Sequence, residues 1–320
     1  MSDSNPFEQF NDIEEIGVRL NDPDTGARRV AIMELADSAD PEAIKFLRDA
    51  LQDDSTEVRL QIALALGEFD GPEAAEALLI ALTDIEISVS QAAAKSLAEL
   101  KDPDCADLIA PFVSHESPFI RAASLEALKE LRRYDYLKVA LEAFSDTDST
   151  VRAQAVSVVG YLQSEETLPA LINMLSDEKS KVRKTAASAL GFSTNTAVTN
   201  ALSSALSDKD WMVREIAAET LAKVGDQNSI NSLRHAIGDD YWQVRQKAIR
   251  SLGKLKAESS IDDIILSLDH EISNLRKEAA AALGEIASNK ATNALKKHLD
   301  DPDIDVRKNI RWALEQIQAQ

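Results

Sequence analysis

One phrase, Val-Arg or a close variant of it, returns along this chain at a fixed period of 31 residues, with no insertion or deletion between copies. Ten copies at one period leave no length for a second domain or a long linker. The repeat therefore predicts one continuous array over residues 1–320. The phrase places its arginine at Arg28, Arg59, Arg121, Arg152, Arg183, Arg214, Arg245, Arg276 and Arg307, and one copy has Ser90 at the equivalent position.

Each copy predicts a pair of helices. Counted from the arginine, position +3 is usually alanine and position +7 is always apolar, which describes one face of a first helix. Glycine at +8 in half of the copies indicates where that helix ends, and preferred N-cap residues at +12 begin the second helix. Neither helix buries its apolar face alone, whereas stacked pairs share one core. The predicted fold is an all-α solenoid of about ten helix pairs.

Composition and charge exclude several classes of protein. Acidic residues outnumber basic ones by 55 to 35, and a net charge of −20 disfavours a nucleic-acid binder. The single cysteine, Cys105, rules out an internal disulfide. No apolar run has membrane-spanning length, and the first ten residues lack the pattern of a signal peptide. We therefore expect a cytoplasmic protein that binds neither membrane nor nucleic acid.

The phrase from Asp208 through Val213 and Arg214 to Leu221 resembles the HEAT repeat. The short period resembles the subgroup called phycobilisome-lyase HEAT-like repeats, and the resemblance covers essentially the whole chain. It implies a right-handed superhelix and a ladder between successive repeats, formed by a turn aspartate and the arginine six residues later. The ladder residues implied here are Asp22 and Arg28, Asp53 and Arg59, Asp146 and Arg152, Asp177 and Arg183, Asp208 and Arg214, Asp239 and Arg245, and Asp301 and Arg307.

Three repeats depart from the ladder. Asp84 precedes Ser90 instead of an arginine, and His115 and His270 stand where the aspartate is expected. Because a charge-assisted pair is missing there, we expect these repeats to be softer.

The placement of the two histidines bears on whether the chain shares the metal site of enzymes in this family. Some relatives attach bilins, and deoxyhypusine hydroxylase binds two irons through four His-Glu dipeptides that follow the repeat arginine. Here His115-Glu116 and His270-Glu271 precede the arginine position and lie five repeats apart, which disfavours a metal site. Acidic neighbours oppose activation of Cys105, and no nucleophile or nucleotide-binding motif is present. The sequence predicts no catalytic residue, metal or cofactor.

Aromatic residues at positions that other repeats keep polar or small indicate a binding surface. Trp211 and Trp242 share position −3, Tyr241 adjoins the second, and Tyr161 and Phe192 share position +9. Packing of the tryptophans on the turn is the competing structural interpretation. Residues 161–320 also carry basic positions such as Arg250 on the first helices, whereas residues 1–160 have a net charge of −18.

These features predict a non-catalytic scaffold or assembly factor that holds a protein on the concave face of the solenoid. Its predicted contact residues are Tyr161, Phe192, Trp211, Tyr241, Trp242 and Arg250. The alternative is a lyase or maturation subunit that acts on a cofactor-bearing protein, similar to the bilin lyases. The partner's identity and the oligomeric state stay open.

Overall fold

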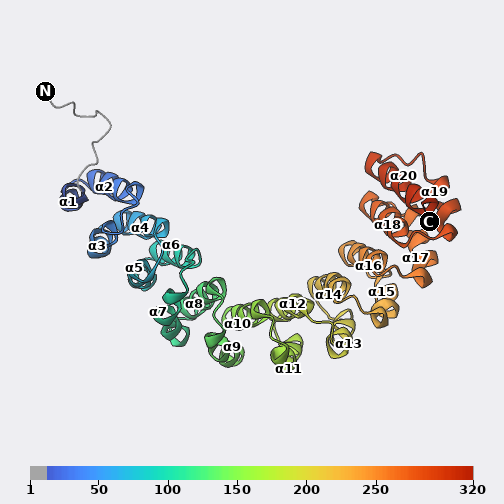
Figure 1. Cartoon of the computed structure of the whole chain (residues 1–320), viewed down its shortest axis with the longest axis horizontal. Helices are drawn as coiled ribbons and strands as arrows, with labels where there is room; N and C mark the ends of the chain where they lie inside the picture. Colours follow the sequence, from blue (N-terminus) through green and yellow to red (C-terminus); the bar gives the residue numbers. More distant parts are fainter. Residues whose placement is uncertain (1–12, 320) are drawn as a thin grey trace. The chain divides into compact units, whose positions relative to one another are not determined.

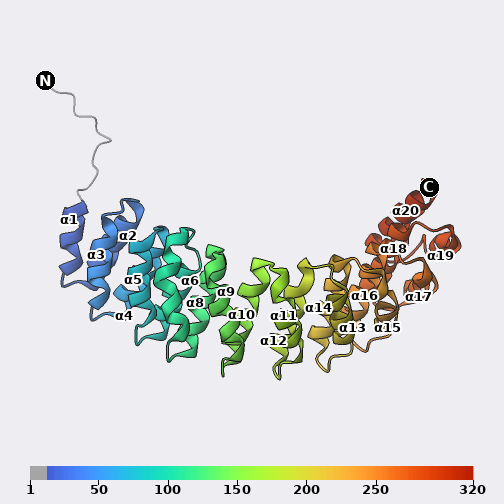
Figure 2. The ribbon, with the colours of Figure 1, turned by 60° about the horizontal axis from the view of Figure 1, so that its bottom comes forward.

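The computed structural model describes residues 13–319, which form helices and turns with no strand among them (Figures 1 and 2). This confirms the predicted all-α fold. The helices that carry the repeat arginine or its equivalent are α2 (Thr25–Asp37), α4 (Thr56–Ala65), α6 (Ile87–Leu97), α8 (Pro118–Leu131), α10 (Ser149–Leu162), α12 (Ser180–Ala189), α14 (Trp211–Val224), α16 (Trp242–Lys254), α18 (Ser273–Ile286) and α20 (Ile304–Gln318). The helices that precede or connect them are α1 (Ile13–Val18), α3 (Ala43–Asp49), α5 (Pro72–Leu82), α7 (Ala106–Ile109), α9 (Leu137–Glu142), α11 (Leu168–Asn173), α13 (Thr196–Ala205), α15 (Ile230–Ala236), α17 (Ile261–Leu266) and α19 (Thr292–Lys297).

The chain divides into two compact units, residues 1–158 and residues 159–320, and the division falls within α10. In the first unit α2, α4, α6 and α8 pack side by side in sequence order. In the second unit α12, α14, α16, α18 and α20 do the same, so each unit has a layer of arginine-bearing helices (Figure 1). The connecting helices form the other layer. The prediction of a single domain over residues 1–320 stays a prediction.

The core of each repeat is built by the predicted apolar positions. In the second unit the +3 alanines, such as Ala217 and Ala248, are fully buried, and so are the +7 leucines, such as Leu221 and Leu252, except the half-buried Leu314. Leu233 of α15 is equally buried from the other layer. Truncating one such leucine to alanine costs about 2–5 kcal/mol, because the cavity left behind does not fully collapse. None of the helices in residues 13–319 combines the length and the apolar content needed to cross a membrane.

All five +8 glycines lie within two residues of the end of their helix, as expected, and three of them stand just inside it. Helices α10, α16 and α18 run past Gly160, Gly253 and Gly284. A Cβ atom at Gly253 would lie 2.7 Å from the Cα of Ala282, so glycine there permits the next helix to approach closely. The α14 and α18 helices end instead at +11, where Gly225 and Ala287 take left-handed conformations with φ of 75° and 55°.

Candidate protein-binding site

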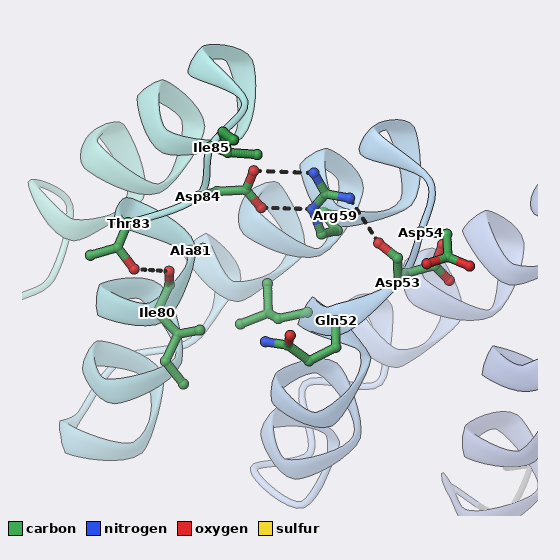
Figure 3. A pocket seen from close by; sticks show the side chains of 10 residues that line it. Gln52, Asp53, Asp54, Arg59, Ile80, Ala81, Thr83, Asp84 and Ile85 are labelled. Atoms are coloured by element: carbon green, nitrogen blue, oxygen red, sulfur yellow. Dashed lines mark hydrogen bonds and ion pairs between the residues drawn. The ribbon is translucent and has the colours of Figure 1, made fainter.

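Each intact rung of the ladder joins the arginine of one repeat to the turn aspartate of the next. Arg59 donates from Nε and Nη2 to the Asp84 carboxylate at 2.6 and 3.1 Å, and from Nη1 to the main-chain oxygen of Asp53 at 2.8 Å (Figure 3). Arg59 and Asp84 also line a cleft of about 430 Å³ beside Ile85. The other rungs within the two units are Arg28–Asp53, Arg121–Asp146, Arg183–Asp208, Arg214–Asp239 and Arg276–Asp301.

The ladder therefore differs in its pairing from the simple pattern of an aspartate and the arginine six residues later. The earlier aspartate offers only its main-chain oxygen, as Asp146 does to Arg152 at 2.8 Å and Asp177 to Arg183 at 2.9 Å. The carboxylate partner of each rung arginine lies 25 residues further along the chain.

Each turn aspartate also holds its own loop. Asp239 accepts from the amide of Tyr241 at 2.9 Å and from two nitrogens of Arg214 at 2.6 and 2.9 Å. Burial alone would raise the pKa of Asp239, but these hydrogen bonds outweigh it and hold that pKa below its ordinary value. The same bond to Asp239 raises the pKa of Arg214. A rung thus fixes the loop that begins the next arginine-bearing helix.

Two positions of the ladder hold histidine, and both histidines keep the loop function of the aspartate. Nδ1 of His115 accepts from the amide of Ser117 at 3.1 Å, and Nδ1 of His270 accepts from the amide of Ile272 at 3.0 Å. Among residues 13–319, no three His, Cys, Asp or Glu side chains converge in an arrangement able to hold a metal ion. The predictions of no metal and no cofactor stay predictions.

Cys105 is fully buried near the start of α7. Burial, together with the charges of Asp102 and Asp70, raises the pKa of its thiol to about 11. A thiol that stays protonated at neutral pH is a poor nucleophile.

Three of the predicted contact residues gather where α14 and α16 begin. The rings of Trp211 and Tyr241 stack with centroids 5.3 Å apart and planes 8° from parallel. The guanidinium carbon of Arg214 lies 5.6 Å from the centroid of the Tyr241 ring. Trp242 is half-buried, while Tyr241 is 46% exposed. We call Trp211, Tyr241 and Trp242 the aromatic edge.

Tyr161 and Phe192 do not join the aromatic edge. Both lie where an arginine-bearing helix ends, at the end of α10 and in the 3-10 turn Leu190–Phe192 that follows α12. Twelve residues of helix separate position −3 from position +9, which is about 18 Å at 1.5 Å per residue. The five aromatic contact residues therefore form two groups at opposite ends of the helices, rather than one patch.

Arg250 lies between these two ends, on the body of α16. It binds Glu278 of α18 through two hydrogen bonds of 2.8 and 2.7 Å, and its side chain is 42% exposed. Lys247 of the same helix pairs with Glu219 of α14 at 2.7 Å. Both cations thus have partners within the layer, and each also helps to join neighbouring helices.

Sequence reasoning missed two exposed apolar features. Trp312 of α20 packs over Gly284 and lines a cleft of about 480 Å³ with Lys254, Lys256 and Glu285. Most repeats have a charged or small side chain at this position, +5, so Trp312 is the sequence feature that could have indicated an exposed apolar site. In the first unit Ile85 is 91% exposed, and its exposed neighbour Ile87 shares position −3 with the two tryptophans of the aromatic edge.

A family model described as HEAT repeats matches residues 13–86, 76–145, 137–203, 193–243 and 236–315, which together cover nearly the whole chain. The subgroup of phycobilisome-lyase HEAT-like repeats is not singled out by this match. No curated protein matches the sequence.

Several solved structures share the fold. An engineered protein is 21% identical, with a TM-score of 0.51 over 96% of this chain and 99% of that one. A chain from the structure of Kap95p with RanGDP is 13% identical, with a TM-score of 0.64 over 95% of this chain and 50% of that one. Importin beta is 14% identical, with a TM-score of 0.59 over 96% and 55%. Human deoxyhypusine hydroxylase is 22% identical over 96% of both chains, but its TM-score is only 0.36.

Proposed function

This chain belongs to the HEAT-repeat family, and on that premise we propose that it is a cytoplasmic, non-catalytic scaffold or assembly factor for a protein partner. The proposed docking surface is the layer of arginine-bearing helices in residues 159–320, which the sequence predicts to be the concave face. The observation that carries the proposal is the aromatic edge, where Trp211 and an exposed Tyr241 are already stacked. Kap95p, which shares the fold, is described as binding RanGDP, so the fold is compatible with holding a protein.

Physical reasons favour the aromatic edge as an anchor. Stacking fixes the rings of Trp211 and Tyr241 before any partner arrives, so little side-chain entropy is lost when a partner covers them. Aromatic side chains also contribute a large apolar area, and tryptophan and tyrosine are enriched among the residues that dominate interface energies. Arg250 extends the surface along α16, and Tyr161 and Phe192 would form a second contact with a partner that spans the helices.

The test begins with recovery of the partner by affinity purification from the native host. Replacing both Tyr241 and Trp242 by alanine should weaken binding by about 1–2 kcal/mol per anchor, with helicity unchanged. Ile87→Ala is a matched control, because Ile87 occupies the same −3 position in α6, outside the proposed docking surface, and is 71% exposed. Full affinity in the double variant, with intact circular dichroism, would place the interface elsewhere.

The opposite ends of the helices can be tested separately. Replacing Tyr161 and Phe192 by glutamate uses the residue that several other repeats carry at +9, so the fold should persist. A loss of affinity in this pair as well as in the Tyr241 and Trp242 pair indicates a partner that spans the layer. A loss only in the latter pair restricts the contact to the aromatic edge.

A second candidate function, a lyase or maturation subunit, rests on the 31-residue period, which resembles the phycobilisome-lyase HEAT-like subgroup. It predicts that the recovered partner carries a cofactor whose attachment fails when this chain is deleted from the host. Normal cofactor loading in the deletion strain would leave the scaffold as the proposal.

A further inference from the structure

Arg245, on the first turn of α16, is a ladder arginine without a partner. Within residues 13–319 it makes no hydrogen bond or ion pair, and its Nε atom is buried with no acceptor. It even lacks the bond to the main-chain oxygen of its own loop that Arg214 makes to Asp208 at 2.8 Å. Arg245 therefore presents a guanidinium group whose donors are all unused by the protein.

The cause lies in the next repeat. The residue 25 positions after Arg245 is His270, where the rungs of the second unit have aspartate. Because Nδ1 of His270 accepts the amide of Ile272, the neutral ring carries its proton on Nε2 and has no acceptor left for an arginine. The rung that would join α16 to the following loop is vacant.

The neighbouring carboxylates supply no hydrogen bond to Arg245, although the charge of Asp239 acts on it. Both oxygens of Asp239 are already bound, to Arg214 and to the amide of Tyr241. Asp269, which precedes His270, lies 3.3 Å from Nε2 of His298. A buried donor without an acceptor loses its hydration and gains nothing in return, so an external acceptor would be favoured.

The surroundings of Arg245 indicate what that acceptor is. Helix α16 carries four basic side chains, Arg245, Lys247, Arg250 and Lys254, and no acidic one. Lys247 and Arg250 have carboxylate partners, and of the other two cations only Arg245 has a buried donor without an acceptor. Tyr241 is the N-cap residue of α16, four residues before Arg245, so an exposed aromatic side chain and the free guanidinium both belong to the start of this helix.

We propose that Arg245 binds an aspartate or glutamate side chain of the protein partner, which takes the place of the missing rung aspartate. The two oxygens of that carboxylate would meet the two terminal nitrogens of Arg245, because Nε is buried. Apolar residues beside the acidic residue would cover the aromatic edge. This inference rests on the proposed docking surface, and it adds the chemistry of the segment that docks there.

The first experiment needs no partner. The full chain with ¹⁵N-labelled arginine is titrated with N-acetyl-aspartate methylamide, and with the asparagine compound as a neutral probe of the same shape, while the Nε–H resonances are followed by NMR. We expect a saturable shift at Arg245 with the acid only, and no shift at Arg214, whose rung is filled. His270→Asp, which supplies the carboxylate within the chain, should abolish the shift, and His115→Asp should leave it unchanged.

No saturable shift at Arg245, an equal shift with the neutral probe, or an equal shift at all arginines would overturn the carboxylate site. With the recovered partner, Arg245→Gln and His270→Asp should each weaken binding at least about tenfold, the loss of one charge-assisted pair. His115→Asp is again the control. Unchanged affinity in both variants would contradict the docking role. If they bind less tightly while the Tyr241 and Trp242 pair binds normally, the carboxylate site stands and the aromatic edge is wrong.

Discussion

The ladder is interrupted once in each unit, and the two interruptions differ in what they leave behind. In the first unit both members of the rung are replaced, because Ser90 stands for the arginine and His115 for the aspartate. Ser90 bonds locally to the main-chain oxygen of Ile87, so no charge is left without a partner. In the second unit only the aspartate is replaced, and Arg245 keeps a buried donor unused.

This difference separates a structural loss from a potential binding site. Replacing both members of a buried pair can be nearly neutral, whereas removing one member leaves the other desolvated and unpaired. A vacancy that retains the arginine therefore lowers stability unless something else supplies a carboxylate. The first vacancy is the natural control for the second.

The largest effect is expected when the aspartate of an intact rung is replaced by histidine, which reproduces the second vacancy. Asp239→His would leave Arg214 without its carboxylate, while the imidazole can still accept the Tyr241 amide as His270 does for Ile272. The side chains of this pair are only 13% and 9% exposed, so we expect a loss of about 2–4 kcal/mol in the free energy of unfolding. Denaturant titration measures it against Asp240→His, an exposed neighbour outside the rung. Equal effects of the two variants would mean that the rung contributes little.

Filling the two vacancies should give gains of intermediate size. His270→Asp alone should stabilise the chain by about 1–2 kcal/mol, because Arg245 then gains the carboxylate partner that it lacks. His115→Asp alone should give no gain, and only its combination with Ser90→Arg should match the first variant. The comparison fails if His115→Asp alone stabilises the chain as much as His270→Asp does in the same thermal or denaturant titration.

A smaller effect is expected in local opening. The missing rung after Ser90 and the left-handed Arg132, with φ of 55°, both weaken the region of residues 84–135. Since repeats are held mainly by their neighbours, hydrogen exchange should be less protected there than in residues 177–225. Uniform protection across the two segments would contradict a weak point at the first vacancy.

The smallest expected effect concerns the pH dependence of intact rungs. Hydrogen bonds from Arg121 to Asp146 and from Arg276 to Asp301 are the main causes that lower the pKa of each aspartate below 3.8. A carboxyl whose pKa is depressed by folding stabilises the protein above the unfolded pKa, and this contribution is lost as the pH falls through the folded pKa. Carboxyl NMR titration should find both pKa values below 3.8. The free energy of unfolding that these rungs contribute should therefore be lost only in acid, as the pH falls from the unfolded pKa through these folded values. Values above 3.8 would show that burial outweighs the rung.

The fold could be predicted from the sequence because the same local rules act in every copy. Alanine at +3 is buried in every copy that has it, and the apolar residue at +7 is buried in every copy except the last, as Ala248 and Leu252 show. The close approach at Gly253 could not be predicted, because a glycine near a helix end is expected without it. Only the short distance to Ala282 shows it.

The site was harder to predict because periodicity gives a position along one helix, not the distance across several. Tyr161 and Trp242 both stand out from their columns of the repeat, yet they lie at opposite ends of their helices. The missing rung at Arg245 could not be predicted either, because the family pattern pairs each arginine with the aspartate six residues earlier. In the structure the carboxylate comes from the aspartate 25 residues later. With that offset known, the substitution at His270 identifies an unpaired arginine from the sequence alone.

The central claim is that a protein partner docks where α14 and α16 begin. Amides in the first turns of α14 and α16, beside Trp211 and Tyr241, exchange when these turns open locally, so a partner that covers them slows their exchange. Hydrogen exchange of the full chain, with and without the recovered partner, is the most direct measurement. The account predicts new protection in residues 211–214 and 241–245. Protection confined to residues 13–158, with these two segments unchanged, would contradict it.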